Sequence, residues 1–326
     1  MILDKIQVDK IKTISDLAPI LSISEDELHF FLDSKDELIK KFLILKKNYD
    51  FRVVFLIKNE SYRHLLKRIT DYLNNKYSLM RPESVHGFVK GKSIFTNAEK
   101  HTERKIILNI DIKDFFSSIS QFKVIEIFTS LGFTKEIAEI FSKLLTVGGV
   151  LATGFSTSPV ISNMICVSID KDFEKLALIY NATYTRYADD ITLSSNDKLP
   201  SLEKIKIILN KNNFILNDKK IRIYRKGGPQ YVTGLTVVDS KPRLSKKFKK
   251  SIRLELYYIK KYGITNHLMY HPKNLNDEVF FSRFSTVLFN GYGLRGFIAF
   301  INSIEPRLAK KMCFVLPKKE DFEYIE

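Results

Sequence analysis

Residues 183–195 read TYTRYADDITLSS, and this stretch decides the fold. Thr, Tyr and Ile, which favour strands, stand on both sides of a tight corner formed by Ala188, Asp189 and Asp190. Two runs of strand-forming residues joined by a short polar corner predict a β-hairpin. This hairpin would present two adjacent carboxylates at its turn.

A further carboxylate, Asp111, lies near the end of the apolar run KIILNIDI at residues 105–112. Side chains alternate between the two faces of a strand, so Ile107, Asn109 and Asp111 share one face of this predicted strand. Asp111 lies far from Asp189 in the sequence, and only the fold can bring the two together. Two neighbouring strands of one sheet would do so.

Carboxylates that converge in this way suit nucleotidyl transfer assisted by divalent metal ions. In that reaction a sugar hydroxyl attacks an α-phosphate, and two Mg²⁺ ions, roughly 3.5–4 Å apart, stabilise the attacking and leaving oxygens. Because Mg²⁺ prefers hard oxygen ligands, we predict that Asp111, Asp189 and Asp190 bind two Mg²⁺ ions, for which Mn²⁺ can substitute. The backbone carbonyl of Ile112 is a predicted further ligand. An ordinary Asp-rich turn is the alternative, and the matching upstream strand favours the metal site.

The composition predicts a folded protein that binds polyanions. The chain has 326 residues, of which 44% are hydrophobic, enough for two or three packed subdomains with a sizeable core. Its 53 Lys and Arg residues outnumber 37 Asp and Glu residues, and the net charge of +16 makes nucleic acid the first candidate partner. A basic protein that is merely kept soluble by its charge is the alternative that composition leaves open.

The sequence indicates neither a secreted nor a membrane protein. No apolar run approaches the roughly 18 residues of a membrane span, and the first residues, MILDKIQVDKIKT, lack the apolar core of a signal peptide. Cys166 and Cys313 have no metal-ligand or disulfide spacing, so we expect two free, buried thiols. We therefore expect a cytoplasmic protein without membrane association.

Helical and strand patterns alternate along the chain. Residues 1–50 are predicted to be helical, and the character of the chain changes near residue 240, where a basic segment begins. The expected strands are residues 51–57, 105–112, 182–187, 191–195, 221–226 and 231–238. The expected helices are residues 61–77, 124–133, 135–149, 159–180, 204–212, 241–263 and 290–306.

Four motifs occur in the order found in reverse transcriptases, and the chain resembles that family. They are NIDIKDFF at 109–116, ATGFSTSP at 152–159, YADD at 187–190 and LNDKK at 216–220. Two shorter matches, NAEKH at 97–101 and VTG at 232–234, resemble signatures of the retron reverse transcriptases of bacteria. Because one precedes the first aspartate and the other follows the catalytic turn, the pair is more specific than either match alone.

The resemblance implies an α+β fold: a right-hand polymerase with fingers, a palm made of an antiparallel sheet plus helices, and a helical thumb. The expected parts are an N-terminal helical segment at 1–50, fingers at 51–105 with a contribution from 133–160, a palm at 106–240 and a thumb at 241–326. The implied activity is that of an RNA-directed DNA polymerase with no nuclease domain after residue 326.

The resemblance also implies roles for individual residues. Lys220 would assist the leaving pyrophosphate, and Phe116 would pack against the incoming sugar and reject a 2′-hydroxyl. The other implied nucleotide-binding residues are Arg52, Asp114, Thr153 and Gly154. The implied RNA- or primer-binding residues are Asn97, His101, Val232, Thr233, Gly234, Lys246, Lys247, Lys249, Lys250 and Arg253. For Arg52 a solvated surface charge, and for His101 a capping role, are the alternatives. A basic, aromatic segment at 86–93 also suits contact with an RNA backbone.

The implied partners are a cognate non-coding RNA, deoxynucleoside triphosphates and the short single-stranded DNA (msDNA) that is copied from the RNA and stays attached to it. Synthesis would start from the 2′-hydroxyl of a guanosine in that RNA, and host RNase H would trim the template. An effector protein encoded nearby and a role in defence against phage are also implied. Two alternatives stay open: a maturase-like or abortive-infection reverse transcriptase with another priming mode, and an inactive scaffold that binds RNA.

Overall fold

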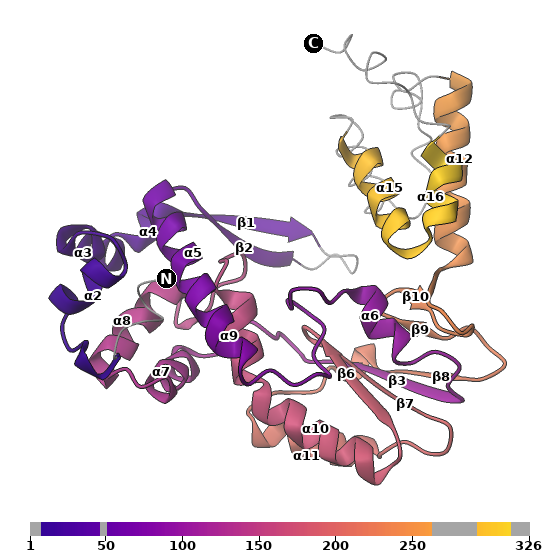
Figure 1. Ribbon diagram of the computed structural model, residues 1–326, viewed down its shortest axis with the longest axis horizontal. Coiled ribbons are helices and arrows are strands. Elements are labelled where there is room, and N and C mark those ends of the chain that lie inside the picture. The colour runs from indigo at the N-terminus through magenta and orange to yellow at the C-terminus, as the bar shows by residue number, and fades with distance from the viewer. Residues whose placement is uncertain (1–7, 46–50, 263–291, 314–326) are drawn as a thin grey trace.

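The computed structural model describes residues 8–45, 51–262 and 292–313, and its fold is of the predicted α+β class with antiparallel sheets. Figure 1 shows three parts: a lobe with the N-terminal helices, a four-stranded sheet with helices against it, and a column of C-terminal helices. The parts follow the order expected for fingers, palm and thumb, while their boundaries near residues 50, 105 and 240 stay predictions. No described helix is long and apolar enough to span a membrane.

The predicted hairpin forms half of an antiparallel sheet with the strand order β6-β7-β3-β8. The strands are β6 (Thr183–Tyr187), β7 (Asp190–Ser195), β3 (Ile106–Asp111) and β8 (Arg222–Arg225). Helices α10 (Val167–Ile179) and α11 (Leu202–Lys211) lie side by side against the sheet (Figure 1). Ile107, Leu108 and Ile110 of β3 are all buried, so both faces of this strand are covered.

The N-terminal lobe combines helices with one long hairpin. Its helices are η1 (Val8–Lys10), α2 (Ile14–Ile20), α3 (Glu25–Asp33), α4 (Lys35–Leu38), α5 (Glu60–Ser78), α7 (Gln121–Ser130), α8 (Lys135–Leu145) and α9 (Ser158–Ile165). The prediction of helix throughout residues 1–50 is wrong for β1 (Ile39–Leu45), which pairs along its whole length with β2 (Phe51–Ile57). Cross-strand pairing here overrides the local helical preference, because it satisfies the backbone along both strands.

Two predicted helices end or break earlier than expected. Helix α8 ends at Leu145, because Gly148 and Gly149 form the positive-φ turn of a short hairpin between β4 (Thr146–Val147) and β5 (Val150–Leu151). The next predicted helix is divided into α9 and α10 at Cys166. Burial raises the pKa of the Cys166 thiol to about 12, so this buried cysteine is chemically inert.

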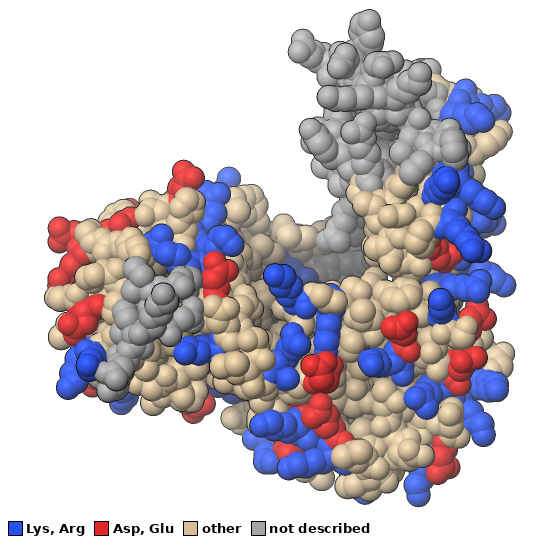
Figure 2. Space-filling model, viewed as in Figure 1, with Lys and Arg blue, Asp and Glu red and all other residues tan. Residues whose placement is uncertain are grey.

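A second hydrophobic core holds the C-terminal part together. Its elements are α6 (Ile94–Glu99), β9 (Tyr231–Val232), β10 (Leu235–Thr236), β11 (Arg243–Leu244), α12 (Lys246–Tyr262), α15 (Tyr292–Ile304) and α16 (Pro306–Cys313). The single strand predicted at 231–238 is wrong, because the chain turns back at Thr233 and Gly234, both with positive φ. Figure 2 shows the molecule hollowed between the N-terminal lobe and the column of α12 and α15.

Candidate active site

The strand pairing brings the predicted carboxylates to one end of the four-stranded sheet. Strands β3 and β7 are antiparallel neighbours, and their register places Asp111 directly opposite Asp190. Asp189 lies in the turn just before β7, and its carbonyl accepts a hydrogen bond of 3.0 Å from the backbone N–H of Ile112. Residues far apart in the sequence therefore meet at one site. The carbonyl of Ile112 stays a predicted metal ligand.

Two polar side chains hold the carboxylate of Asp111. Its Oδ2 accepts a hydrogen bond of 2.7 Å from Lys220 Nζ, and its Oδ1 accepts one of 2.9 Å from Asn217 Nδ2. Both partners come from the segment around η2 (Asp218–Lys220), and the backbone N–H of Asn217 also donates to the Asp111 carbonyl at 2.9 Å. Sequence reasoning does not single out Asn217, although its place in the same motif as Lys220 is the signal that could have identified it.

Burial and mutual repulsion raise the pKa values of the two turn carboxylates. The pKa of Asp190 is raised to about 7, first by burial and then by the charges of Asp189 and Asp111. The pKa of Asp189 is raised by burial and by Asp111, while the positive charges of Lys220 and Arg52 oppose this rise. A cation bound among these carboxylates would relieve their repulsion.

The chemistry of this donor set fits a divalent metal ion. The carboxylates of Asp111, Asp189 and Asp190 supply the hard oxygens that Mg²⁺ prefers. Within the described ranges, however, no group of three or more His, Cys, Asp or Glu side chains is arranged to hold a metal ion. Lys220 instead neutralises Asp111: burial lowers the pKa of its ammonium group, but the hydrogen bond to Asp111 and the neighbouring carboxylates raise it overall. A metal ion bound to Asp111 would therefore compete with Lys220 for the negative charge of this carboxylate.

A pocket of about 490 Å³ opens beside these residues. Its wall includes Asp111, Asp190 and Lys220 together with Thr233 and Gly234 of the β9–β10 turn. Three tyrosines add aromatic surface to the wall, namely Tyr187, Tyr224 and Tyr231. Three of the four predicted catalytic residues, Asp111, Asp190 and Lys220, and two of the predicted primer-binding residues thus line a common pocket, whereas Asp189 is not part of its wall.

The predicted nucleotide-binding residues Arg52, Asp114 and Phe116 occupy different environments. Arg52 is exposed on β2, and its charge acts on Asp189, so the hairpin brings a cation near the carboxylates. Asp114 is exposed and has a positive φ of 48°. Phe116 is half-buried, and its ring centroid lies 5.3 Å from that of Phe115. Their contacts with a nucleotide stay predictions.

Thr153 and Gly154 lie against the backbone of β2. The Thr153 carbonyl accepts a hydrogen bond of 2.8 Å from the Phe55 N–H. A Cβ added to Gly154 would lie 2.3 Å from the Phe55 carbonyl oxygen, so only glycine fits at this position. Both residues therefore help to position the β1–β2 hairpin that carries Arg52.

Of the residues predicted to bind RNA, Asn97, His101 and Val232 are buried. His101 is 0% exposed, and its Nδ1 and Nε2 each lie 2.7 Å from a hydroxyl, of Ser194 on β7 and Thr185 on β6. Burial lowers the pKa of the His101 imidazole to about 3, so the ring is neutral. The predicted RNA contacts of these three residues are wrong in this structure, because their side chains are enclosed by the protein.

The NAEKH and VTG motifs contact each other instead. Asn97 Nδ2 donates a hydrogen bond of 3.5 Å to Thr233 Oγ1, which in turn donates one of 3.2 Å to the Ile94 carbonyl. Val232 packs in the second core with Ala98 of the first motif. The two motifs therefore form one unit that holds the β9–β10 turn at the pocket. Contacts of Thr233 and Gly234 with a primer stay predictions.

Helix α12 presents most of the predicted basic face. The exposed members of this face are Lys246, Lys247, Lys250 and Arg253. Figure 2 shows Lys and Arg side chains gathered along this helix. Lys249 differs, because it is half-buried and its Nζ lies 2.7 Å from Glu305 Oε1, which also accepts a hydrogen bond of 2.9 Å from the Leu244 N–H. Lys249 therefore ties α12 to the end of α15, and its contact with RNA stays a prediction.

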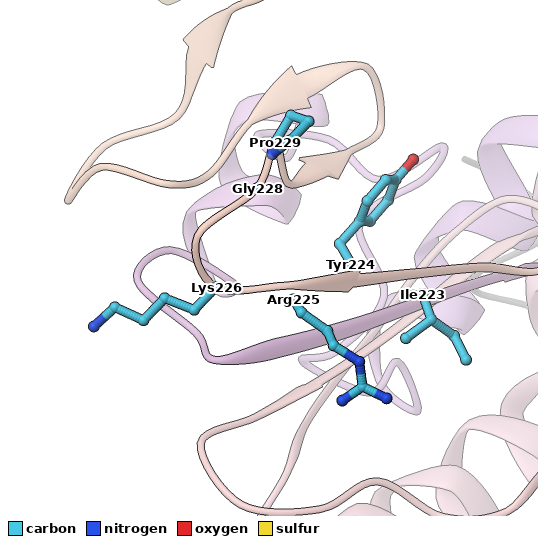
Figure 3. A pocket seen from close by; sticks show the side chains of 6 residues that line it. All are labelled: Ile223, Tyr224, Arg225, Lys226, Gly228 and Pro229. Atoms are coloured by element: carbon cyan, nitrogen blue, oxygen red, sulfur yellow. The ribbon is translucent and has the colours of Figure 1, made fainter.

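A second, more open pocket lies at the outer edge of the sheet, on β8 and the turn that follows it (Figure 3). Ile223 and Arg225 point to one side of β8, and Tyr224 points to the other. The remaining lining residues are Lys226, Gly228 and Pro229. Because none of its lining residues is acidic, this pocket offers no carboxylate to a metal ion, and the pocket beside Asp111 is the better candidate for catalysis.

The chain is similar to known reverse transcriptases. The family model described as reverse transcriptase (RNA-dependent DNA polymerase) matches residues 44–252. The retron Ec73 reverse transcriptase of Escherichia coli is 32% identical over 296 residues, which cover 84% of this chain and 85% of that protein. The retron Mx65 reverse transcriptase of Myxococcus xanthus is 30% identical over 277 residues, which cover 75% of this chain and 64% of that protein.

Other relatives match over shorter lengths. The retron Ec86 reverse transcriptase of Escherichia coli is 32% identical over 198 residues, 60% of this chain and 60% of that protein. The chain thus spans less than two thirds of the Mx65 and Ec86 proteins. Among solved structures, telomerase from Candida albicans in complex with a fragment of telomeric RNA has a TM-score of 0.47 and 12% identity, covering 87% of this chain and 59% of that chain.

Proposed function

The chain belongs to the reverse transcriptase family and, within it, to the retron reverse transcriptases, and from this premise we propose that it copies RNA into DNA. The observation that carries the proposal is the register of β3 and β7, which sets Asp111 opposite Asp190 and close to Asp189. The net charge of +16 suits a template and product that are both polyanions. We place the reaction in the cytoplasm, where RNA and deoxynucleoside triphosphates are available.

The residues of the site have separate tasks in this reaction. Divalent metal ions held by Asp111, Asp189 and Asp190 would stabilise the charge on the attacking and leaving oxygens. Lys220 carries protons on Nζ within 2.7 Å of Asp111, so it can donate one to the leaving pyrophosphate. Arg52 supplies a fixed positive charge from the β1–β2 hairpin for the triphosphate.

The proposed template is a cognate non-coding RNA, part of which is copied into msDNA from the 2′-hydroxyl of an RNA guanosine. The similarity to the Ec73, Mx65 and Ec86 retron proteins supports this finer assignment. The unit formed by the NAEKH and VTG motifs also supports it, since it places Thr233 and Gly234 in the wall of the catalytic pocket. Trimming by host RNase H, a nearby effector protein and defence against phage complete the proposal.

The nucleic acid bound to the protein tests how synthesis starts. The chain is expressed from its own locus and purified, and its bound nucleic acid is extracted and treated with RNase, DNase and a debranching enzyme. A short DNA whose 5′ end is released only by debranching is the expected result. A DNA with a free 5′ end would overturn the priming mode in favour of a maturase-like enzyme, and RNA alone would overturn the polymerase in favour of a scaffold.

Loss of the turn carboxylates tests the site itself. We expect Asp189→Asn combined with Asp190→Asn to abolish DNA synthesis while RNA binding survives, because the amides cannot replace the charge of the metal ligands. Asp26→Asn, at an exposed position of α3, is the matched control and keeps full activity. DNA synthesis by the double variant would show that the site is assigned wrongly.

A further inference from the structure

Arg186, which precedes the catalytic turn by two residues, is the largest fully buried side chain in the described part of the molecule. Its guanidinium forms a two-pronged ion pair with Asp170 of α10, with Nε 2.7 Å from Oδ1 and Nη2 2.7 Å from Oδ2. Tyr184 also donates a hydrogen bond of 2.7 Å to Asp170 Oδ1. Burying such a pair costs much of what its attraction returns, so stability alone is a weak reason for its presence.

The third nitrogen of the guanidinium reaches the catalytic turn. Nη1 of Arg186 donates a hydrogen bond of 3.1 Å to the carbonyl of Ala188 and one of 3.0 Å to Asn163 Oδ1. Ala188 has a φ of 58°, a left-handed conformation that residues with a Cβ rarely adopt. Asp189 follows directly in the chain. Arg186 thus holds the Ala188 carbonyl, and the orientation of this peptide group sets the position of Asp189, which follows it.

A second segment, residues 84–87, pairs with the backbone just before the turn. The backbone of residues 84–87 runs beside Arg186: Arg186 N–H donates to the Ser84 carbonyl at 3.0 Å, and His86 N–H donates to the Arg186 carbonyl at 2.8 Å. Asn163 joins the two sides, because its Nδ2 donates a hydrogen bond of 3.0 Å to the Gly87 carbonyl.

Gly87 touches the turn most closely. A Cβ on this residue would lie 2.2 Å from the backbone nitrogen of Ala188 and 2.9 Å from the carbonyl carbon of Tyr187. Both are backbone atoms, so the turn itself would have to move to accept any side chain. The segment predicted to contact RNA through residues 86–93 therefore packs directly against the catalytic turn at Gly87.

We propose that Arg186, Asp170, Asn163 and Gly87 form a clamp that fixes the backbone of the YADD turn and so positions the carboxylates of Asp189 and Asp190. Arg186 and Asn163 are positioning residues, since they reach the reacting atoms only through the turn. The proposal rests on the proposed function, because it concerns the same two carboxylates. A planar guanidinium suits the task, since it can bind a carboxylate with two nitrogens and the turn with the third.

Variants that keep the ion pair but loosen the turn test the clamp. Arg186→Lys retains a charge for Asp170 but cannot reach all of the partners of the guanidinium, and Asn163→Ala removes the link to Gly87. Gly87→Ala pushes on the turn directly. For each variant we expect kcat for nucleotide addition and affinity for Mn²⁺ to fall by about 10- to 100-fold, the usual effect of disturbing groups that orient metal ligands. The RNA affinity of the Arg186→Lys and Asn163→Ala variants should be unchanged.

The control separates positioning from a general loss of stability. Ile169→Val, a neighbour of Asp170 on α10, removes one buried methyl group but none of these hydrogen bonds. It should lower the melting temperature while leaving kcat and Mn²⁺ affinity unchanged. Mn²⁺ binding is followed by electron paramagnetic resonance on folded, metal-free protein, so it does not depend on catalysis.

Two outcomes would overturn the clamp. One is folded Arg186→Lys and Asn163→Ala variants with wild-type kcat and Mn²⁺ affinity. The other is an Ile169→Val variant that loses Mn²⁺ affinity as strongly as they do. Failure of the proposed function gives a different pattern: a wild-type chain that makes no DNA, while the clamp variants still bind Mn²⁺ more weakly than the wild type does.

Discussion

The contact between Asp111 and Lys220 joins a predicted metal ligand to the predicted proton donor for the leaving pyrophosphate. The Lys220 side chain is 57% exposed, whereas that of Asp111 is 5% exposed. Asp111 is also held by the amide of Asn217, so the aspartate is buried and has two partners, whereas the lysine side chain faces solvent. Lys220 can therefore turn from the carboxylate toward a bound phosphate without disturbing the core.

Removing this lysine should slow the chemistry without weakening RNA binding. For Lys220→Ala we expect kcat for single-nucleotide addition to fall by about 10²- to 10⁴-fold, the range typical for loss of a general acid. Lys219→Ala, the exposed neighbour, is the matched control and should keep its kcat. Equal losses in the two variants would contradict a specific role for Lys220 and indicate a general effect of charge.

His101 should make the stability of the protein depend on pH. Burial, with smaller effects from the charges of His86 and Arg104, lowers its pKa from 6.5 to about 3. Below pH 6.5 the unfolded chain therefore takes up a proton at His101 that the folded protein does not bind, and the contribution of this residue to stability falls as the pH drops toward 3. The slope from this residue approaches about 1.4 kcal/mol per pH unit.

Urea denaturation between pH 7 and 5 measures this slope. His101→Gln should be less stable at pH 7, because the ring bridges two hydroxyls, but its free energy of unfolding should fall less steeply with pH. Part of the slope should remain, since burial also lowers the pKa of His86 to about 4. His64→Gln, at an exposed position of α5, should keep the wild-type slope. Parallel slopes for His101→Gln and the wild type would contradict the prediction.

At the scale of elements, sequence patterns predict the strands and helices that are determined by interactions between residues close in sequence. The β6–β7 hairpin follows from strand-forming residues around a tight corner, and β3 follows from its apolar alternation. Strand β1 could not be predicted in this way, because IKKFLIL becomes a strand only through its pairing with β2. The turn at Thr233 and Gly234 could not be predicted for a similar reason, because it is held by the contacts of Thr233 with Asn97 and Ile94, which are distant in sequence.

The close approach of Gly154 to β2 predicts a sensitive point in the β1–β2 hairpin. In Gly154→Ala the added Cβ would meet the Phe55 carbonyl oxygen at 2.3 Å, with a φ of 109° that alanine rarely adopts. We expect the free energy of unfolding to fall by about 1–3 kcal/mol, as in other overpacked sites. The KM for deoxynucleoside triphosphates should rise, because the hairpin carries Arg52.

Gly228→Ala is the control for this change. A Cβ at Gly228 would lie 3.8 Å from the Arg225 carbonyl oxygen, which is ordinary van der Waals contact. Denaturant unfolding and steady-state kinetics of the two variants should therefore differ. If Gly154→Ala is as stable and as active as Gly228→Ala, the close packing of β2 on Gly154 is not important in solution.

At the scale of the whole molecule, the site depends on elements that no single stretch of sequence connects. The meeting of Asp111 with Asp189 could be predicted, because the motif order resembles that of a known family. The clamp could not, since it joins Arg186 to Asp170, Asn163 and Gly87 through burial that composition does not reveal. The charge pattern could be predicted only in part. The sequence predicts that α12 is basic, but only the packed structure shows that Lys249 is paired with Glu305.

The basic face of α12 should determine how strongly salt weakens RNA binding. Lys246, Lys247, Lys250 and Arg253 are exposed on it, and each phosphate contact contributes about 0.7–0.9 to the slope of log K against log[salt]. Changing all four to Gln should therefore reduce this slope by up to about 3 and weaken binding most at low salt. Filter binding of one RNA hairpin across a KCl series measures the slope. The matched control changes four exposed lysines outside α12, namely Lys67, Lys171, Lys175 and Lys198, to Gln. It removes the same charge, so an equal loss of slope in the two variants would mean that RNA responds to the net charge of the protein and not to this helix.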